Sequence, residues 1–449
     1  MDRHAVITGM GAIAPNGIGL HDFASALRAG RSGISNAAPA ERGLDGQNPL
    51  HGRPRATVAT RALGACRQWD PASALPAAET ARLPRLVPMA IAAAQQAITQ
   101  SNIDISTDDH AQRLSVILGT GAGGIDFTLT QSKNTYHSPP GNHQKPDNRP
   151  TPSIWTITNA THGNLAGELS IALGARGPSL CISDGCASAS DALGHALMLL
   201  RSDAPHAPDA VLVAGADAHL RWETILGMEL LGVLSSNTDR EPAHLSRPFD
   251  RDRDGFILAE GAWAVLLERP DHAARRDATP IATIDGFAMT CDAYHRVRPN
   301  PAMTESARAI RLAIEDAGLT PADIELVHYH GTATELNDRL ETAAVKTAFA
   351  HHASRLRGHS VKSMIGHPQG ASGLASLVAT LAGLTNADRH ESGPFVFPTI
   401  NLDTPDPDCD LNYTPNHNTT ARGDEVFLVN CLAFGAKNSA LVGRALPSH

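Results

Sequence analysis

Cys186 is the residue whose chemistry depends most on its position in this sequence. Residues 179–183 before it are few, mostly apolar and preceded by Gly-Pro, which predicts a buried strand. From Ala187 onward apolar residues recur at steps of three and four, which predicts a helix. A thiol at that junction faces the unpaired N–H groups of the first helical turn and the positive end of the helix dipole, and both favour the nucleophilic thiolate. The alternative is a small buried hydrophobic residue.

Three segments in the second half of the chain place reactive side chains after apolar stretches. His330 follows the apolar run in ELVHYHGTATELND, at the C-terminal end of a predicted strand, where sites gather in α/β folds. Lys362 and His367 lie in SVKSMIGHPQGASG, and Phe434 follows a predicted strand in NCLAFGAKNSA. Each also has a structural interpretation, as a core histidine, a solvated lysine or a core ring.

Strands and helices alternate along the chain, which predicts an α/β protein. Strands are expected over 114–124, 209–217, 281–290, 324–332 and 425–435, and helices over 87–98, 159–173, 303–317, 338–350 and 371–386. Residues 36–86 have little periodicity, and the proline-rich residues 131–153 indicate a surface loop. The polar stretch 269–280 is the best boundary between two halves, each of which begins with a strand.

Composition excludes several classes of protein. The 449 residues carry a formal charge of −9 and contain no block of lysine or arginine, which argues against a nucleic-acid binder. The six cysteines include no CxxC pair, so reduced thiols are expected. Because a membrane span needs an apolar run of about 18 residues and none is found, and the N-terminus lacks a signal-peptide pattern, we expect a cytoplasmic protein without membrane contact.

The reactive segments together resemble the condensing enzymes of fatty-acid and polyketide synthesis. HGTATELND, VKSMIGH, AFGAKN and GCASAS are similar to the motifs of β-ketoacyl-acyl carrier protein synthases of the elongating, synthase II-like type. AVITGMGAIAPNG, RPFDRDRDGFILAEGA, CDAYHRVRPNP and PTINLDTPDPDCDLNYTPN resemble the same family and stand in its order and spacing. The resemblance covers essentially the whole chain, and the combination is far more specific than any one motif.

The resemblance implies a decarboxylative Claisen condensation. Cys186 would take an acyl group from acyl carrier protein (ACP), and the backbone N–H groups of Cys186 and Phe434 would hold the oxyanion of that transfer. His330 and His367 would hydrogen-bond the thioester carbonyl of malonyl-ACP and stabilise the enolate that forms when CO2 leaves. The enolate carbon would then attack the Cys186 thioester to give β-ketoacyl-ACP.

The resemblance also implies supporting residues. Lys362 would pair with Glu341 and set the local charge balance, and Phe434 would be a gate that moves when the acyl chain enters. Thr332 and Asp338 of HGTATELND would support the site. No cofactor or metal is expected, because the substrates are carried on the phosphopantetheine of ACP.

The implied fold is a thiolase-like, five-layered α/β/α/β/α arrangement of two similar halves. Residues 1–270 would carry the nucleophile, and residues 271–449 would carry the histidines, the lysine and the gating phenylalanine. Besides ACP, the expected partner is a second subunit, either another copy or a chain-length-factor-like protein. The regions 36–86 and 131–153 would form this interface or face ACP.

Several residues depart from the family pattern. Asp184 and Gly185 replace Thr and Ala before the cysteine, and at strand spacing Asp184 would share a face with Cys186, where an inward carboxylate would oppose the thiolate. Ala433 and Lys437 replace Gly and Thr in the gating segment, and GHPQG contains an unusual Pro-Gln. Candidates for ACP docking are Arg61, Arg67, Arg82 and Arg85. These departures favour a specialised polyketide, polyene or modified fatty-acid pathway.

Four alternatives stay open on the sequence. The first is a housekeeping elongation synthase. The second is a thiolase, because GHPQGASG resembles the thiolase histidine loop and Cys431 lies near the place of the second thiolase cysteine, although thiolases lack the HGT histidine. The third is a non-catalytic partner subunit that shapes a tunnel. The fourth is a Cys–His hydrolase, for which the sequence has no family motif.

Overall fold

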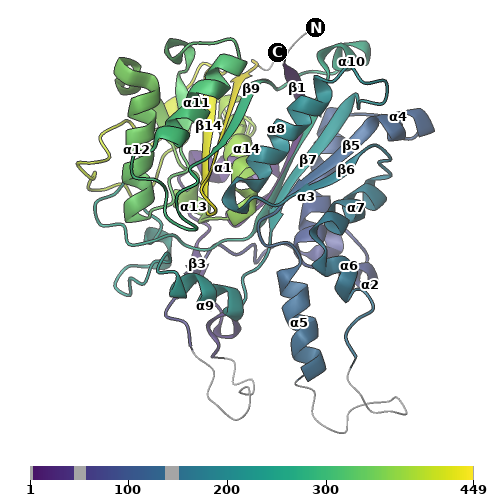
Figure 1. The fold of residues 1–449 in the computed structure, drawn as a ribbon, viewed down its shortest axis with the longest axis horizontal. Coiled ribbons are helices and arrows are strands. Elements are labelled where there is room, and N and C mark those ends of the chain that lie inside the picture. Colours follow the sequence, from purple (N-terminus) through teal and green to yellow (C-terminus); the bar gives the residue numbers. More distant parts are fainter. Residues whose placement is uncertain (1–3, 45–56, 137–150, 448–449) are drawn as a thin grey trace.

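The computed structural model describes residues 4–44, 57–136 and 151–447, and one large mixed sheet runs through it (Figure 1). Its eleven strands have the order β11-β10-β14-β15-β9-β1-β8-β7-β5-β6, with β2 beside β1. The first half of the chain supplies β1 (Ala5–Ala14), β2 (Gly17–Ile18), β5 (Leu114–Gly119), β6 (Ser179–Ile182), β7 (Ala210–Asp217) and β8 (Gly261–Glu268). The second half supplies β9 (Ala282–Cys291), β10 (Leu326–His328), β11 (Arg357–His359), β14 (Val426–Ala433) and β15 (Lys437–Ala445).

The two halves of the sheet repeat one topology. In each half the first strand pairs antiparallel with the last, and the last pairs antiparallel with the strand before it. The remaining pairs, β7-β5-β6 and β14-β10-β11, are parallel. β1 and β9 join the halves by a short antiparallel contact between residues 5–7 and 282–284. The two similar halves expected from the sequence are confirmed.

The two halves of the sheet form two layers, and helices between them and outside them complete the five-layered fold. α8 (Ser188–Leu200) and α14 (Ser372–Leu384) form the middle layer, and every residue of α14 is buried, as expected for a helix that is apolar on all sides. Because alternate strand residues face opposite ways, Val211 and Val213 of β7 face this layer while Leu212 faces α3 (Leu86–Ser101) and α7 (His162–Leu173). α11 (Thr304–Asp316) and α12 (Glu335–Phe349) cover the other side.

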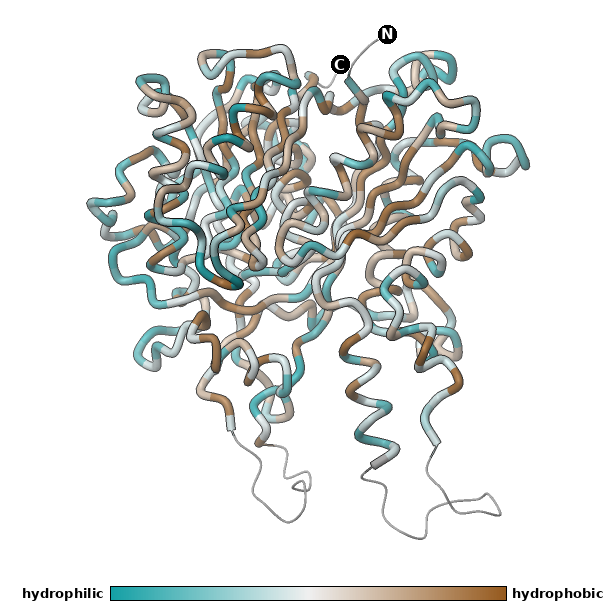
Figure 2. Tube along the Cα trace, in the orientation of Figure 1, coloured by the Kyte–Doolittle hydropathy of each residue, from teal (hydrophilic) through white to brown (hydrophobic). Residues whose placement is uncertain are grey.

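Hydropathy follows these layers. In Figure 2 the trace is most hydrophobic along the strands and most hydrophilic at outer elements such as α4 (Asp108–Arg113) and α10 (Pro270–Arg275). Within the described ranges, no helix combines the length and apolar character needed to cross a lipid bilayer. The remaining short elements are α1 (Leu20–Arg28), α2 (Ala77–Thr80), α6 (Thr156–Ala160), α9 (Trp222–Leu230), α13 (Lys362–Ile365), β3 (Ser35–Asn36), β4 (Ala62–Leu63), β12 (Phe395–Val396) and β13 (Thr419–Thr420).

Two local predictions are wrong. Residues 131–136, expected to begin the loop over 131–153, are helical, because α5 (Ile125–Tyr136) continues through a stretch free of proline and glycine. Residues 137–150 lie outside the described part. The strand before Cys186 is not buried: Ser179 and Leu180 of β6 are exposed, because β6 is the last strand at its side of the sheet. A short apolar run does not by itself distinguish an edge strand from a central one.

Glu268, at the end of β8, is a buried carboxylate whose charge should contribute to stability at neutral pH. Burial alone would raise its pKa, but hydrogen bonds from Arg276, His272 and Thr8 outweigh burial and lower the pKa from 4.5 to about 2. A depressed pKa stabilises the fold above pH 4.5, and the contribution is lost as the pH falls towards 2, with a size of about 3 kcal/mol. We therefore expect wild type to exceed Glu268→Gln in unfolding free energy at pH 7, and the difference to shrink between pH 4.5 and 2 in urea titrations. A constant difference would contradict this.

Candidate active site

Cys186 lies in a 3-10 turn, Gly185–Ala187, between β6 and α8, at the predicted strand-to-helix junction. The turn requires glycine at position 185, where φ is +58° and the loop after β14 passes close by. The Cys186 side chain is buried and its Sγ lies 3.7 Å from Oε1 of Gln369. The backbone N–H groups of Phe434 and Cys186 both donate toward the thiol. Two backbone donors therefore converge where the oxygen of a Cys186 thioester would sit.

The thiol of Cys186 is protonated in the resting site. Burial raises its pKa to about 12, although Lys362 and the two backbone N–H groups act in the opposite direction. The backbone N–H groups at the helix start favour the thiolate, as expected, but the loss of hydration outweighs them. Attack by Cys186 therefore requires a base that takes the proton.

His330 and His367 are the two groups that can take it. Their rings are 5.4 Å apart and nearly perpendicular, and the Cys186 sulfur and one nitrogen of each ring lie within 4.8 Å of one another. Burial lowers the pKa of both imidazoles well below the usual value, and Lys362 lowers both further. Both rings are therefore neutral at pH 7, and each can donate one hydrogen bond and accept another.

The chain fixes the orientation of both rings. The Ser372 hydroxyl at the start of α14 lies 3.1 Å from Nδ1 of His367, and the Cys431 sulfur lies 3.6 Å from Nδ1 of His330. Because Nδ1 of each ring is engaged, Nε2 is left for a substrate. Cys431 also donates to the Cys186 carbonyl at 3.1 Å, so its described contacts hold the site together.

The predicted pairing of Lys362 with Glu341 is wrong as a direct contact. Lys362 Nζ donates to the His330 carbonyl at 2.7 Å, while the Glu341 carboxylate accepts from the N–H groups of His330 and Gly331 at 2.6 and 2.8 Å. Asn430 donates to the same carboxylate at 2.6 Å. Burial raises the pKa of Glu341 to about 7 and lowers that of Lys362. Lys362 and Glu341 thus both act on the His330 backbone, one at its carbonyl group and the other at its N–H group.

The other two predicted supporting residues lie in the same segment. Asp338 accepts from the backbone N–H of Thr332 at 3.1 Å and from that of Phe249 at 2.8 Å. Thr332 lines a cavity of about 560 Å³ that opens from Cys186 toward solvent, as do His330, His367 and Phe434. Phe434 is half-buried in the wall of this cavity. The structure therefore brings together every site residue predicted from the sequence.

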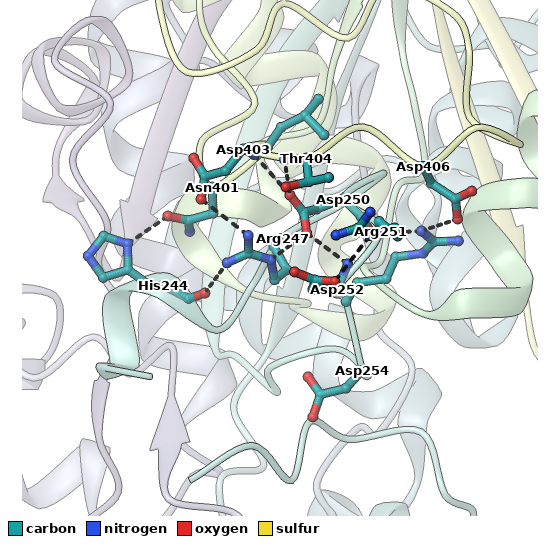
Figure 3. Close-up of polar contacts among 12 residues, drawn as sticks. His244, Arg247, Asp250, Arg251, Asp252, Asp254, Asn401, Asp403, Thr404 and Asp406 are labelled. Carbon is teal, nitrogen blue, oxygen red and sulfur yellow. Dashed lines mark hydrogen bonds and ion pairs between the residues drawn. The ribbon is translucent and has the colours of Figure 1, made fainter. Parts of the chain in front are cut away.

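An ion-pair network supports the His330 segment from behind. Two segments that resembled the family, 247–256 and 398–416, bind each other there (Figure 3). Asp250 accepts from the backbone N–H groups of Asp403 and Thr404 at 2.9 and 2.8 Å. Arg253 binds Asp406 at 2.7 Å and donates to the carbonyl of Thr334 at 3.1 Å. These charged side chains thus fix the loop that follows His330.

Asp184 and Lys437, two departures from the family pattern, form an ion pair with each other. Asp184 does not share a buried face with Cys186, because β6 ends at Ile182 and the carboxylate lies toward solvent at Lys437. The pair ties the nucleophile turn to the first residue of β15, three positions after Phe434. It therefore joins the two segments that supply the backbone donors.

We expect Asp184→Asn and Lys437→Met each to slow acylation of Cys186 by about threefold to tenfold, with a loss of unfolding free energy below about 1 kcal/mol. The reason is that the pair holds the Phe434 N–H against the nucleophile turn. The double exchange Asp184→Lys with Lys437→Asp should recover most of the rate, measured by intact mass against time. The exposed pair Lys346–Asp410 supplies the control, and breaking it should leave acylation unchanged. Equal effects of both pairs would contradict this role.

Sequence reasoning assigned no role to Asp217 and Ser372, noted Gln369 only as an unusual residue of GHPQG, and considered Cys431 only for the thiolase alternative. Asp217, at the end of β7, accepts from the N–H groups of Gly121, Ala122 and Gly370 and from the Thr120 hydroxyl. It thereby holds the loop of His367 against the strand ends beside Cys186. The sequence signal was its place at the end of a predicted strand, the same signal that singled out His330.

The arginines suggested for ACP docking are engaged within the chain. Arg85 pairs with Glu260, Arg82 with Glu79 and Arg67 with Glu41. Arg61 donates to the Arg240 carbonyl. To bind ACP, these arginines would have to share their present contacts with the partner or exchange them for new ones.

Comparisons with known proteins agree with this geometry. The family model "Beta-ketoacyl synthase, N-terminal domain" matches residues 2–273, and "Beta-ketoacyl synthase, C-terminal domain" matches residues 281–392. The 3-oxoacyl-[acyl-carrier-protein] synthase 2 of Synechocystis sp. is 35% identical over 98% of this chain and 97% of its own.

Two solved structures are similar over 99% of this chain and all of their own. One is a ketosynthase bound to the hexaketide in complex with its type II polyketide synthase acyl-carrier protein, with a TM-score of 0.84 and 27% identity. The other is the ishigamide ketosynthase/chain length factor, with a TM-score of 0.81 and 26% identity.

Proposed function

We propose the roles of individual residues from the premise that this chain belongs to the β-ketoacyl synthase family, and that it condenses an acyl thioester with malonyl-ACP. The observation that carries the proposal is the convergence of one thiol, two neutral imidazoles and two backbone donors at the inner end of one cavity. Residues 1–270 supply the nucleophile, and residues 271–449 supply the histidines, Lys362 and Phe434.

The first step is acyl transfer. The Cys186 sulfur attacks the thioester carbonyl of acyl-ACP while a neutral imidazole takes its proton. The N–H groups of Cys186 and Phe434 hold the oxyanion. The carbon–sulfur bond to the carrier breaks, and the imidazole returns the proton to the departing pantetheine thiol.

The second step forms the carbon–carbon bond. Malonyl-ACP places its thioester oxygen between His330 and His367, the bond to its carboxylate breaks, and CO2 leaves. The electron pair becomes an enolate whose oxygen the two imidazoles stabilise by hydrogen bonding. Its carbon attacks the Cys186 thioester, the carbon–sulfur bond breaks, and the Cys186 thiolate takes a proton that comes from solvent as β-ketoacyl-ACP departs. No step calls for a metal or a resident cofactor, because phosphopantetheine arrives with the carrier.

The departures at Asp184, Gln369, Ala433 and Lys437 support a specialised polyketide, polyene or modified fatty-acid pathway, with housekeeping fatty-acid elongation as the alternative. The partners are ACP and a second subunit, either another copy or a chain-length-factor-like protein, as in the ishigamide ketosynthase/chain length factor.

The test offers the purified protein acyl-ACP with malonyl-ACP, and separately acetyl-CoA alone. We expect β-ketoacyl-ACP and one equivalent of CO2 only with malonyl-ACP. Condensation with acetyl-CoA alone would show a thiolase, and hydrolysis of the acyl thioester without condensation would show a hydrolase. Either result would overturn the proposal.

A further inference from the structure

Several polar side chains among the described residues have buried atoms that lack a hydrogen-bond partner, and three of them form a series that begins beside Cys186. They are Gln369 through Nε2, His219 through both ring nitrogens, and Asp126 through Oδ1. His219 is only 1% exposed and Gln369 7%. Because protein interiors pair almost all buried polar groups, such a set calls for a partner from outside the chain.

These groups lead away from the nucleophile. Gln369 begins the series, with its Oε1 3.7 Å from the Cys186 sulfur. The next residue, Gly370, donates to Asp217 at 2.7 Å, and Nδ1 of His219 lies 3.9 Å from the same carboxylate. Burial lowers the pKa of His367 and raises that of Asp126, and His219 lies close enough to act on both, in the downward direction. The unpartnered atoms therefore extend from Cys186 to the start of α5.

The open cavity reaches Cys186 from another direction. Its lining includes Arg298, Asn337 and Phe434 but none of Gln369, His219 and Asp126. A carrier arm fills the open cavity if the proposed function holds. The acyl group bound to Cys186 must then extend from its thioester into the protein interior, on the side where the unpartnered groups lie.

We propose, resting on the proposed acylation of Cys186, that these groups bind an oxygen-bearing acyl chain. Gln369 Nε2 can donate to a keto or hydroxyl oxygen, and the His219 ring offers a nitrogen that can donate to the same groups. Asp126 Oδ1 can accept from a hydroxyl group. A saturated chain satisfies none of them, so the site selects partly unreduced or hydroxylated chains over hydrocarbon chains.

The test compares acyl-ACPs of one chain length. The panel is octanoyl-ACP and its derivatives with a keto or hydroxyl group at carbon 5 or carbon 7, offered pairwise in competition to the full-length protein. We expect at least one oxygenated chain to load Cys186 about tenfold faster than octanoyl, measured by intact mass. His219→Phe should reduce that ratio to about one or invert it in favour of octanoyl.

His359→Phe is the matched control, because His359 is also buried with an unpartnered Nδ1 but lies on β11, the strand at the opposite edge of the sheet from β6. It should leave the ratio unchanged. Wild-type protein that loads octanoyl as fast as every oxygenated chain would overturn the inference, even if His219→Phe does not fold, and would assign the unpartnered atoms to water. Failure of every chain to load Cys186 would instead contradict the proposed function.

Discussion

Cys186→Ala is expected to abolish both the acyl adduct and the condensation, with a loss on the order of 10⁴–10⁶-fold in rate. No other described sulfur can replace it, because Cys431, which lies against the same site, donates to the Cys186 carbonyl and is buried behind it. Alanine removes only the sulfur from a buried turn, so the fold should be retained. The measurement is intact mass after incubation with acyl-ACP, together with product formation from malonyl-ACP.

Cys409→Ala is the control, since Cys409 is a buried cysteine of the core between the second half of the sheet and its outer helices. It should load normally. If Cys186→Ala left product formation by the purified complex unchanged, the chain would be the non-catalytic partner that stayed open on the sequence.

His330→Ala and His367→Ala should separate the two steps. Each removes one of two donors to the enolate, so CO2 release from malonyl-ACP should fall about 10²–10³-fold. Loading of Cys186 should fall much less, by about tenfold, because the remaining neutral imidazole can still take the thiol proton. The double variant should lose both steps. Loading is followed by intact mass and decarboxylation by release of labelled CO2.

His195→Ala is a suitable control, because His195 is half-buried on α8 and bonds only to the Asp191 carbonyl among the described contacts. It should change neither rate by more than about twofold. Equal losses of loading and decarboxylation in the single histidine variants would mean that the two rings do not divide the work as proposed.

The sequence predicts the site better than it predicts the site's electrostatics. Cys186, His330, His367 and Phe434 follow strand ends or loops whose local patterns are strong, and parallel strands bring such ends together. The protonation of Cys186 could not be predicted, because its pKa depends on burial by residues distant in the sequence. The family resemblance implies a direct Lys362–Glu341 pair, whereas in the structure both side chains bind the His330 backbone, which lies between them.

The fold shows a similar division. The long apolar helices and the repeated strands follow from periodicity. The predicted position of Asp184 is wrong, because it assumes that strand spacing continues to Cys186, whereas β6 ends at Ile182. The Asp184–Lys437 contact spans 253 positions and has no local signal. Asp184 and Lys437 both depart from the family pattern, but nothing in the sequence connects them with each other.

The position of β1 in the centre of the sheet has a consequence for how the chain reaches its native state. β1 pairs with β8 on one side and with β9 on the other. On the β8 side, Thr8 donates a hydrogen bond to Glu268, 260 positions later in the chain. A strand whose partners on both sides lie so far along the chain must wait for them before either edge is covered. Contacts of such separation slow folding, and an uncovered strand invites aggregation. Recovery of catalytic activity on refolding should accordingly lag behind recovery of helical circular dichroism.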